Sequence, residues 1–304
     1  MATQPGTMNA TRNLTDIDMG IPENLTELRN DPTTAQWDDR DVMLYALGIG
    51  MGEDPMNPDE LAYVNEGWIT PRDPALKVVP TFASVAAWNA RPPAIDINRV
   101  LVVDAQRDIT FHKPLPIAAQ VTADSRWIGA WDKGDKGAII VRETKVRDDK
   151  GDPLFTLQGT TFARGDGNFG GPTSGQPETP APPDRAADLS IDVATRPGQA
   201  LLYRLSGDRN PLHSDPEFAA KAGFKAPILH GMCTYGITCR AVLATFADWD
   251  GTAIKRHACR FSAPVYPGET ITVDLWRDKT TLHFQAHIKD RGVICVKNGL
   301  TELR

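Results

Sequence analysis

The segment Tyr203-Arg-Leu-Ser-Gly-Asp-Arg-Asn-Pro-Leu-His213 decides how this 304-residue chain is interpreted. It places a carboxylate at Asp208, an amide at Asn210 and an imidazole at His213 within six residues. Gly207, which precedes Asp208, and Pro211, which lies between Asn210 and His213, favour tight turns. Such a turn can direct Asp208 and His213 toward one water molecule, and the two groups can exchange protons near neutral pH. The segment therefore predicts a site for general acid–base chemistry.

A second segment, Lys225-Ala-Pro-Ile-Leu-His-Gly-Met-Cys-Thr-Tyr-Gly236, begins seventeen residues after Asp208. Its proline and first glycine precede an expected helix over residues 232–246. The first N–H groups of a helix have no partner inside the helix, so they are free to bind an anion. The backbone N–H of Gly231 is therefore a candidate donor to a developing oxyanion.

Together the two segments resemble the signature of the (R)-specific 2-enoyl-CoA hydratases, or hydratase 2 enzymes, of the MaoC-like hot-dog family. The pattern Gly-Asp-x-Asn-Pro-x-His occurs at residues 207–213, and Pro-x-x-His-Gly follows at 227–231. The resemblance covers about residues 35–304. It implies an α+β double hot dog, in which two antiparallel sheets each wrap a helix. It also implies reversible syn hydration of trans-2-enoyl-CoA to (R)-3-hydroxyacyl-CoA.

The resemblance also implies roles for individual positions. Asp208 and His213 would hold the attacking water between them, and the sequence leaves open which of the two is formally the base. Asn210 would orient the loop or the substrate, and Gly231 would stabilise the thioester oxyanion. The expected substrate contacts are Lys133, Arg209, Pro211, Leu212, Phe261, Asp104 and Ala105.

Some of these positions have equally plausible structural roles. Lys133 lies in a turn and is either a phosphate contact of coenzyme A or a solvated lysine. Phe261 either packs on the pantetheine or adenine or is a core aromatic residue. Asp104 and Ala105 stand where relatives often carry His-Gly, and this departure indicates a different acyl group. The other histidines are interpreted as a loop or supporting residue (His230) and as structural or surface residues (His112, His257, His283 and His287).

The chain divides at a segment rich in turn-forming residues. Residues 165–183 contain five Gly and five Pro in 19 positions, which excludes a helix or a central strand. We therefore predict an N-terminal repeat over 1–164, a linker over 165–185 and a catalytic repeat over 186–304. The halves are degenerate copies, and Gly50 and Pro55 stand where the second half has Asp208 and His213. The N-terminal repeat is thus expected to be catalytically silent, and the resemblance implies that it houses the acyl chain.

Each half is predicted to contain helices packed on strands. A helix is expected from Asp38 or Asp39 to about Gly48, since either aspartate can cap it. A second helix is expected over 82–88. The expected strands are 101–111, 118–128, 137–147 and 153–162 in the first half, and 189–195, 254–261, 270–278, 281–289 and 293–303 in the second.

Composition excludes several function classes. The net charge of −6 arises from 33 basic and 39 acidic residues and does not favour nucleic acid or an anionic membrane as a partner. No apolar run reaches the length of a membrane span, and the polar N-terminus lacks a signal-peptide pattern. The four cysteines lack metal or redox spacing, which predicts reduced thiols in a cytoplasmic protein. No metal or cofactor is expected, since coenzyme A would be part of the substrate.

Three other functions remain open at this level. A hot-dog thioesterase would usually need a carboxylate on the central helix, and residues 232–246 contain no Asp or Glu. An acyl-carrier-protein dehydratase would need a basic docking patch, which a sequence cannot reveal. A non-enzymatic acyl-CoA-binding subunit would have no need of the Asp208–His213 pair. The expected partner is an acyl-CoA thioester, and the chain is expected to be a monomer or a homodimer, with the homodimer slightly preferred.

Overall fold

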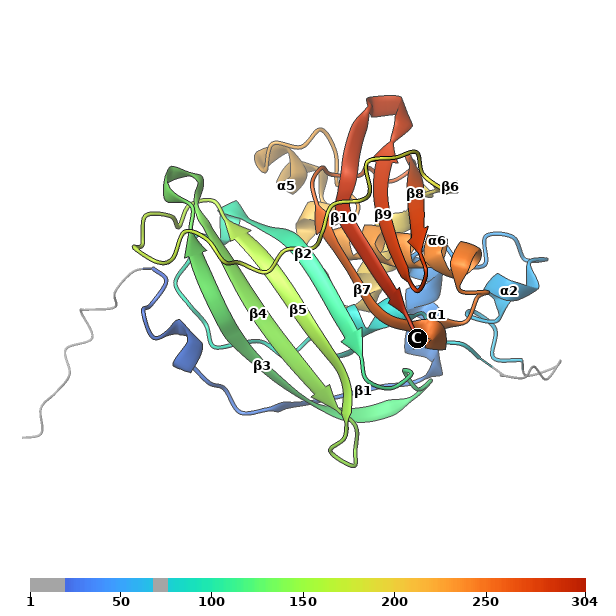
Figure 1. Cartoon of the computed structure of the whole chain (residues 1–304), viewed down its shortest axis with the longest axis horizontal. Helices are drawn as coiled ribbons and strands as arrows, with labels where there is room; N and C mark the ends of the chain where they lie inside the picture. The colour runs from blue at the N-terminus through green and yellow to red at the C-terminus, as the bar shows by residue number, and fades with distance from the viewer. Residues whose placement is uncertain (1–19, 68–75) are drawn as a thin grey trace, which may run out of the picture.

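The computed structural model describes residues 20–67 and 76–304, so the polar N-terminal stretch considered above lies outside the described residues. Ten strands form one antiparallel sheet in the order β1-β3-β4-β5-β2-β7-β10-β9-β8-β6 (Figure 1). Their bounds are β1 Thr33–Trp37, β2 Val102–Phe111, β3 Ala119–Asp132, β4 Ala138–Arg147, β5 Pro153–Ala163, β6 Leu189–Ala194, β7 Ile254–Phe261, β8 Thr270–Asp278, β9 Thr281–Ile288 and β10 Val293–Leu303.

The strand order reveals an internal repeat. The first half has the order 1-3-4-5-2, and the second half has 6-8-9-10-7, which is the same order with each strand number raised by five. The halves meet where β2 pairs with β7, from Gln106 opposite Arg260 to Thr110 opposite Arg256. This arrangement confirms the double hot dog. The two expected sheets are in fact joined edge to edge into one continuous sheet.

The helices are α1 Asp39–Gly48, α2 Pro58–Leu61, α3 Ala83–Ala86, α4 Gln199–Tyr203, α5 Pro216–Lys221 and α6 Gly231–Phe246. At the start of α1, the Asp38 carboxylate accepts from the Asp41 N–H and the Asp41 carboxylate accepts from the Asp38 N–H. This reciprocal cap explains why the helix begins there. The helix expected over 82–88 is wrong in extent, because Pro80–Phe82 is a 3₁₀ turn and α3 ends at Ala86.

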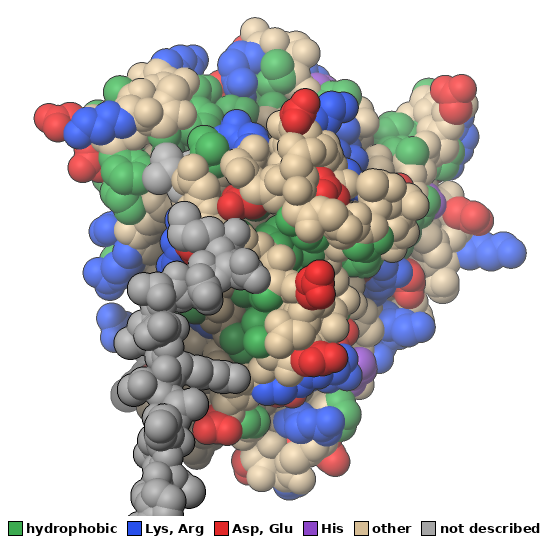
Figure 2. Space-filling model, turned by 90° about the vertical axis from the view of Figure 1, so that its left-hand side faces the viewer, with side chains coloured by type: hydrophobic (Ala, Val, Ile, Leu, Met, Phe, Trp, Pro, Cys, Tyr) green, Lys and Arg blue, Asp and Glu red, His purple; other side chains and the backbone are tan. Residues whose placement is uncertain are grey.

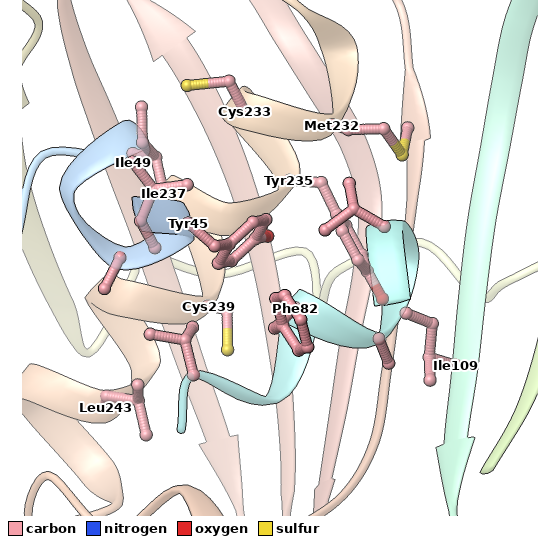
Figure 3. Close-up of a cluster of buried hydrophobic side chains, with 14 of the residues drawn as sticks. Tyr45, Ile49, Phe82, Ile109, Met232, Cys233, Tyr235, Ile237, Cys239 and Leu243 are labelled. Carbon is pink, nitrogen blue, oxygen red and sulfur yellow. The ribbon is translucent and has the colours of Figure 1, made fainter. Parts of the chain in front are cut away.

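Helix α6 is the buried centre of the molecule. Most of its side chains are inaccessible to solvent, and Arg240 is its only charged residue. Figure 3 shows Tyr45 of α1, the adjoining Ile49 and Phe82 gathered beside Tyr235 and Cys239 of α6. Gly236 permits this approach, because a Cβ atom there would lie 2.9 Å from the Tyr45 hydroxyl. The Pro80–Phe82 turn of the first half contacts α6, and side chains of α6 share one buried cluster with side chains of both halves.

The segment between β5 and β6 contains no helix or strand, yet it is fixed to both halves. On the first half, the Asp132 carboxylate accepts backbone N–H groups from Asn168 and Gly170. On the second half, Asn298 donates to the carbonyl of Thr179, and Trp276 donates to the carbonyl of Arg185. Hydrogen bonds to both halves therefore hold this connecting segment in place.

The surface carries mixed charges. Figure 2, which views the first half from outside, shows Lys and Arg side chains interspersed with Asp and Glu. Among the residues that the structure describes, every helix falls short of the length and hydropathy that a membrane span requires.

Candidate active site

Asp208 lies in the loop after α4, and side-chain hydrogen bonds to backbone N–H groups fix the turns of this loop. Gly207 has φ +128°, a conformation that favours glycine, and a Cβ atom there would lie 3.3 Å from the Trp88 ring. The Asp208 carboxylate accepts from the N–H of Asn210 at 3.1 Å, and the Asn210 side chain accepts from the N–H of Leu212 at 3.0 Å. These bonds give Asn210 a definite role in shaping the loop.

His213 lies in the 3₁₀ turn that follows and is largely buried. Its Nδ1 is 2.8 Å from the carbonyl oxygen of Ile228. A carbonyl only accepts, so Nδ1 carries the hydrogen and Nε2 of the neutral ring keeps its lone pair. Burial lowers the pKa of His213 below its ordinary value, which favours the neutral ring at physiological pH. His213 is therefore oriented to accept a proton at Nε2.

His230 supports the same loop from the opposite segment. Its Nε2 is 3.1 Å from the backbone carbonyl of Asp208, so this nitrogen donates. Its ring stacks on His213 with centroids 3.7 Å apart, and the tilted Tyr203 ring packs against it with centroids 5.0 Å apart. Burial and the neighbouring His213 lower the pKa of His230 to about 3. His230 is therefore a neutral positioning residue, which agrees with a supporting hydrogen-bond role.

The polar atoms of Asp208, His213 and His230 converge. One carboxylate oxygen of Asp208 and one nitrogen of each histidine lie within 4.8 Å of one another. Since each hydrogen bond to water spans about 2.8 Å, one water molecule can bridge the Asp208 carboxylate and His213. The structure thus brings together the two groups that the sequence paired.

The start of α6 completes the site. His230 is the N-cap residue and Gly231 is the first residue of the helix. Within the described part of the chain, the Gly231 N–H makes no hydrogen bond, so it can donate to a ligand. The ring of Phe261 lies over Gly231, at 3.7 Å from the position of a Cβ atom there. The absence of a side chain at Gly231 keeps its N–H accessible, and the helix dipole favours negative charge at this point.

The other residues that were predicted to contact the substrate lie at several places in the structure. Arg209 and Pro211 are exposed on the loop of residues 207–213, the candidate catalytic loop. Leu212 is half-buried there, and its carbonyl accepts from the Ile228 N–H. The Lys133 ammonium donates to the carbonyl of Thr173 and to the side chain of Gln176. Lys133 therefore holds the connection between the halves, and the described residues show no hydrogen bond or ion pair between its ammonium group and the loop of residues 207–213.

Asp104 and Ala105 lie on β2 at a register shift that separates Asp104 from Gln106. The Asp104 carboxylate accepts from Nη2 of Arg107 at 3.0 Å. Its charge also raises the pKa of His213, although less than burial lowers it. The departure from His-Gly at this position is thus accompanied by a buried arginine, which sequence reasoning did not identify.

The corresponding place in the first half has no proton-transfer groups. Gly50 has φ +89°, and a Cβ atom there would lie 3.1 Å from Nη1 of Arg240. Pro55 is exposed in a turn. A buried ion pair stands there instead, with Arg240 of α6 donating to Glu60 of α2 at 2.9 Å. An Arg240–Glu60 ion pair thus lies where the second half has Asp208 and His213.

Comparison with known proteins agrees with this arrangement. Residues 178–298 match the model of the MaoC-like domain, and residues 36–165 match the MFE-2 hydratase 2 N-terminal domain. Enoyl-CoA hydratase ChsH3 of Mycobacterium tuberculosis is 43% identical over 86% of this chain and 90% of its own. The peroxisomal enoyl-CoA hydratase 2 of Arabidopsis thaliana is 36% identical over 86% and 88%.

Among solved structures, the MaoC-like dehydratase from Phytophthora capsici superposes with a TM-score of 0.82 at 30% identity. The match covers 92% of this chain and 98% of that one. The family models, the relatives and the repeated strand order therefore agree that the chain belongs to the MaoC-like hydratase 2 family of double hot-dog proteins.

Proposed function

We propose that the chain catalyses the reversible syn hydration of trans-2-enoyl-CoA to (R)-3-hydroxyacyl-CoA. The observation that carries the proposal is the convergence of the Asp208 carboxylate and the His213 ring within 4.8 Å, beside the free N–H of Gly231. Hydration needs an activated water, a proton for C2 and a donor to the thioester oxygen. This site offers a group for each task. Relatives named as enoyl-CoA hydratases support the assignment.

In the proposed reaction, one water molecule lies between Asp208 and Nε2 of His213. Its oxygen attacks C3, the C2–C3 π electrons move toward the thioester oxygen, and the pair takes one proton from the water. The N–H of Gly231 stabilises the enolate oxygen as its charge develops. The pair then returns a proton to C2, which restores its starting state. Addition is syn because the hydroxyl and the proton come from the same face.

The substrate would enter along the surface that joins the catalytic loop to Phe261. We propose that Phe261 packs on the thioester arm, since its ring lies over Gly231. The exposed Arg209, with Pro211 and Leu212, would border the same entrance. A coenzyme A contact at Lys133 is the weakest of these assignments, because its ammonium group already has two acceptors.

A second candidate is dehydration of a 3-hydroxyacyl thioester, including one on a carrier protein. A relative that is 39% identical over 85% of this chain is named 3-hydroxyacyl-thioester dehydratase Y. The same groups would run the reaction in reverse. A thioesterase is disfavoured, because α6 carries no Asp or Glu that could act as base or nucleophile.

We further propose that catalysis requires no metal and no cofactor, that the chain is a homodimer or a monomer, and that it works in the cytoplasm. The four cysteines are unpaired and buried, which fits a reducing compartment. Peroxisomal names among the relatives make the peroxisome the alternative. Light scattering and a fluorescent fusion would test oligomeric state and location.

The decisive experiment measures the loss of 263 nm absorbance when purified protein meets trans-2-enoyl-CoAs of several lengths. Chiral analysis of the 3-hydroxyacyl product would establish the (R) configuration. Turnover that depends on both Asp208 and His213 would support the proposal. A folded protein that hydrates none of these thioesters, yet dehydrates a carrier-protein substrate, would favour the second candidate.

A further inference from the structure

Strand β2 carries an ion pair with one buried member beside the active site. Nη2 of Arg107 donates to the Asp104 carboxylate at 3.0 Å. Gly159 of β5 pairs with Arg107 and leaves room for its guanidinium group, since a Cβ atom on this glycine would clash with Nη1. The Arg107 side chain is 4% exposed and the Asp104 side chain is 45% exposed. The pair therefore has a buried positive end and a half-exposed negative end.

The positive end of the pair lies at the start of α6. Nε of Arg107 donates to the sulfur of Met232 at 3.0 Å, and Met232 follows Gly231 in the first turn of the helix. Phe261, whose ring lies over Gly231, belongs to β7, the strand that pairs with β2. Arg107 is therefore a fixed positive charge near the N–H group that is proposed to bind the thioester oxygen.

The negative end of the pair acts on the histidine of the site. Burial lowers the pKa of His213, and the hydrogen bond to the Ile228 carbonyl raises it. The charges of Asp208 and Asp104 also raise it. The groups that face the His213 ring are thus Asp208 on its own loop, Asp104 on β2, and the neutral His230 that stacks on it. Asp104 favours positive charge on this ring.

Arg91 indicates that Asp104 and Asp208 border the same space. Its guanidinium group stacks on Trp88 at 4.5 Å, beside the candidate catalytic loop. Burial and the charge of Arg107 lower the pKa of Arg91. The charges of Asp208 and Asp104 raise it. One carboxylate from the loop and one from β2 therefore act on the same exposed arginine.

The proposed hydration separates charge in the same direction as this ion pair. As water attacks C3, negative charge develops on the thioester oxygen at Gly231. Positive charge develops on the Asp208–His213 pair as it takes the proton. Fixed charges that are already arranged to match such a change lower the barrier, because they need no reorganisation during the reaction. The ion pair has its positive end toward Gly231 and its negative end toward His213, which is the sense that favours the transition state.

We propose that the Asp104–Arg107 pair is a fixed dipole that stabilises the transition state of hydration. The inference rests on the proposed hydratase function and gives the departure from His-Gly at residues 104 and 105 a part in the chemistry. The two residues act through the catalytic loop and the start of α6, so they are positioning residues. Because their contribution arises only as charge separates, their loss should lower kcat and leave KM unchanged.

The test removes both ends of the dipole in the double variant Asp104→Asn/Arg107→Met and follows the loss of enoyl-CoA. kcat should fall about 10- to 100-fold, and KM should stay within about twofold of the wild-type value. Replacing an ion pair by neutral side chains is often neutral or stabilising for the fold. The melting temperature should therefore be unchanged or raised while the reaction slows, a combination that a purely structural role would not produce.

A second ion pair on the same strand supplies the matched control. Asp108 of β2 and Arg256 of β7 are joined at 2.7 Å. Asp108→Asn/Arg256→Met removes the same two charges four residues along the strand from Asp104, and it should leave kcat within about twofold of the wild-type value.

The outcomes separate the dipole from the proposed function. Unchanged kcat in Asp104→Asn/Arg107→Met overturns the inference and leaves the hydratase function standing, as does an equal loss in the control variant. If the double variant does not fold, Asp104→Asn decides, because asparagine still accepts the bond from Arg107 and lacks only the charge. Its kcat should fall about 3- to 10-fold, and an unchanged value overturns the inference. A wild-type protein that hydrates no enoyl-CoA contradicts the proposed function, and the inference falls with it.

Discussion

Replacing Asp208 by asparagine should separate the chemistry of the site from its shape. The Asp208 carboxylate accepts one backbone hydrogen bond, from the N–H of Asn210 at 3.1 Å. An asparagine amide oxygen has the same position and accepts the same bond, so the turn should survive. The free energy of unfolding should change by less than about 1 kcal/mol, the net value of one such bond.

The reaction, in contrast, should slow severely. Asparagine cannot take or return a proton, and removing a general acid–base group typically costs about 100- to 10,000-fold. At about 1.36 kcal/mol per factor of ten, this corresponds to about 2.7–5.4 kcal/mol in the activation barrier. The double variant with His213→Gln should be scarcely slower than either single variant, because the two residues act on one water as a unit.

Asp215 supplies a matched control on the same loop. Its carboxylate caps α5 by accepting from the N–H groups of Glu217 and Phe218, and asparagine caps a helix equally well. Asp215→Asn thus makes the same change of charge seven residues away and should leave turnover unchanged. The assay is enoyl-CoA loss at 263 nm, with thermal melting beside it. If Asp208→Asn kept turnover within threefold of the wild type, or if Asp215→Asn lost as much, the assignment of the pair would be wrong.

Three further expectations follow from the structure. Burial lowers the pKa of His230 and of His257 to about 3, so below pH 6.5 the unfolded chain binds more protons than the folded one. The free energy of unfolding, measured by urea titration, should therefore fall by about 1.4 kcal/mol per pH unit for each histidine between pH 6 and pH 4. A flat profile would contradict the burial of these histidines. Arg240→Met should destabilise the protein by about 3–5 kcal/mol by leaving Glu60 buried and unpaired. Adding Glu60→Met should recover much of this loss in the same urea titration. Unchanged stability in Arg240→Met would contradict the importance of the ion pair for folding. Turnover should survive EDTA, whereas Zn²⁺ should inhibit by binding the carboxylate and two histidines of the site; activity that EDTA abolishes and added metal restores would refute a metal-free reaction.

The strands were predictable to within a few residues because hydrophobic alternation and turn residues mark their ends. The edge strand β1, Thr33–Trp37, was missed, since five residues with one buried side chain give no pattern. Helix α6 was expected one residue short at its start. The helix expected over 82–88 ends early, since the backbone of Ala87 leaves the helical conformation at φ −122° and ψ 48°.

The site was predictable only where its residues are close in the sequence. Asp208, Asn210 and His213 share one loop, so their juxtaposition follows from the turn. The stacking of His230 on His213 depends on how two loops pair, through bonds such as that between His213 and Ile228. Arg107 and Arg142 become neighbours only because both pair with Gly159 of β5, so no local pattern could have revealed that they lie together. The two bonds of Lys133 to the connecting segment were likewise beyond sequence reasoning.

The junction of β2 with β7 has a consequence for how the chain is made. Gln106 and Arg260, which lie opposite each other there, are separated by about 154 residues, so β2 emerges from the ribosome long before its partner. At about 5–20 residues per second, the delay is roughly 8–30 seconds. During this time the nascent first half exposes an unpaired strand edge and lacks α6 to cover its core, and such edges recruit other chains. The N-terminal half expressed alone should therefore aggregate, and the whole chain should need the edge of β2 to be protected until β7 has been made.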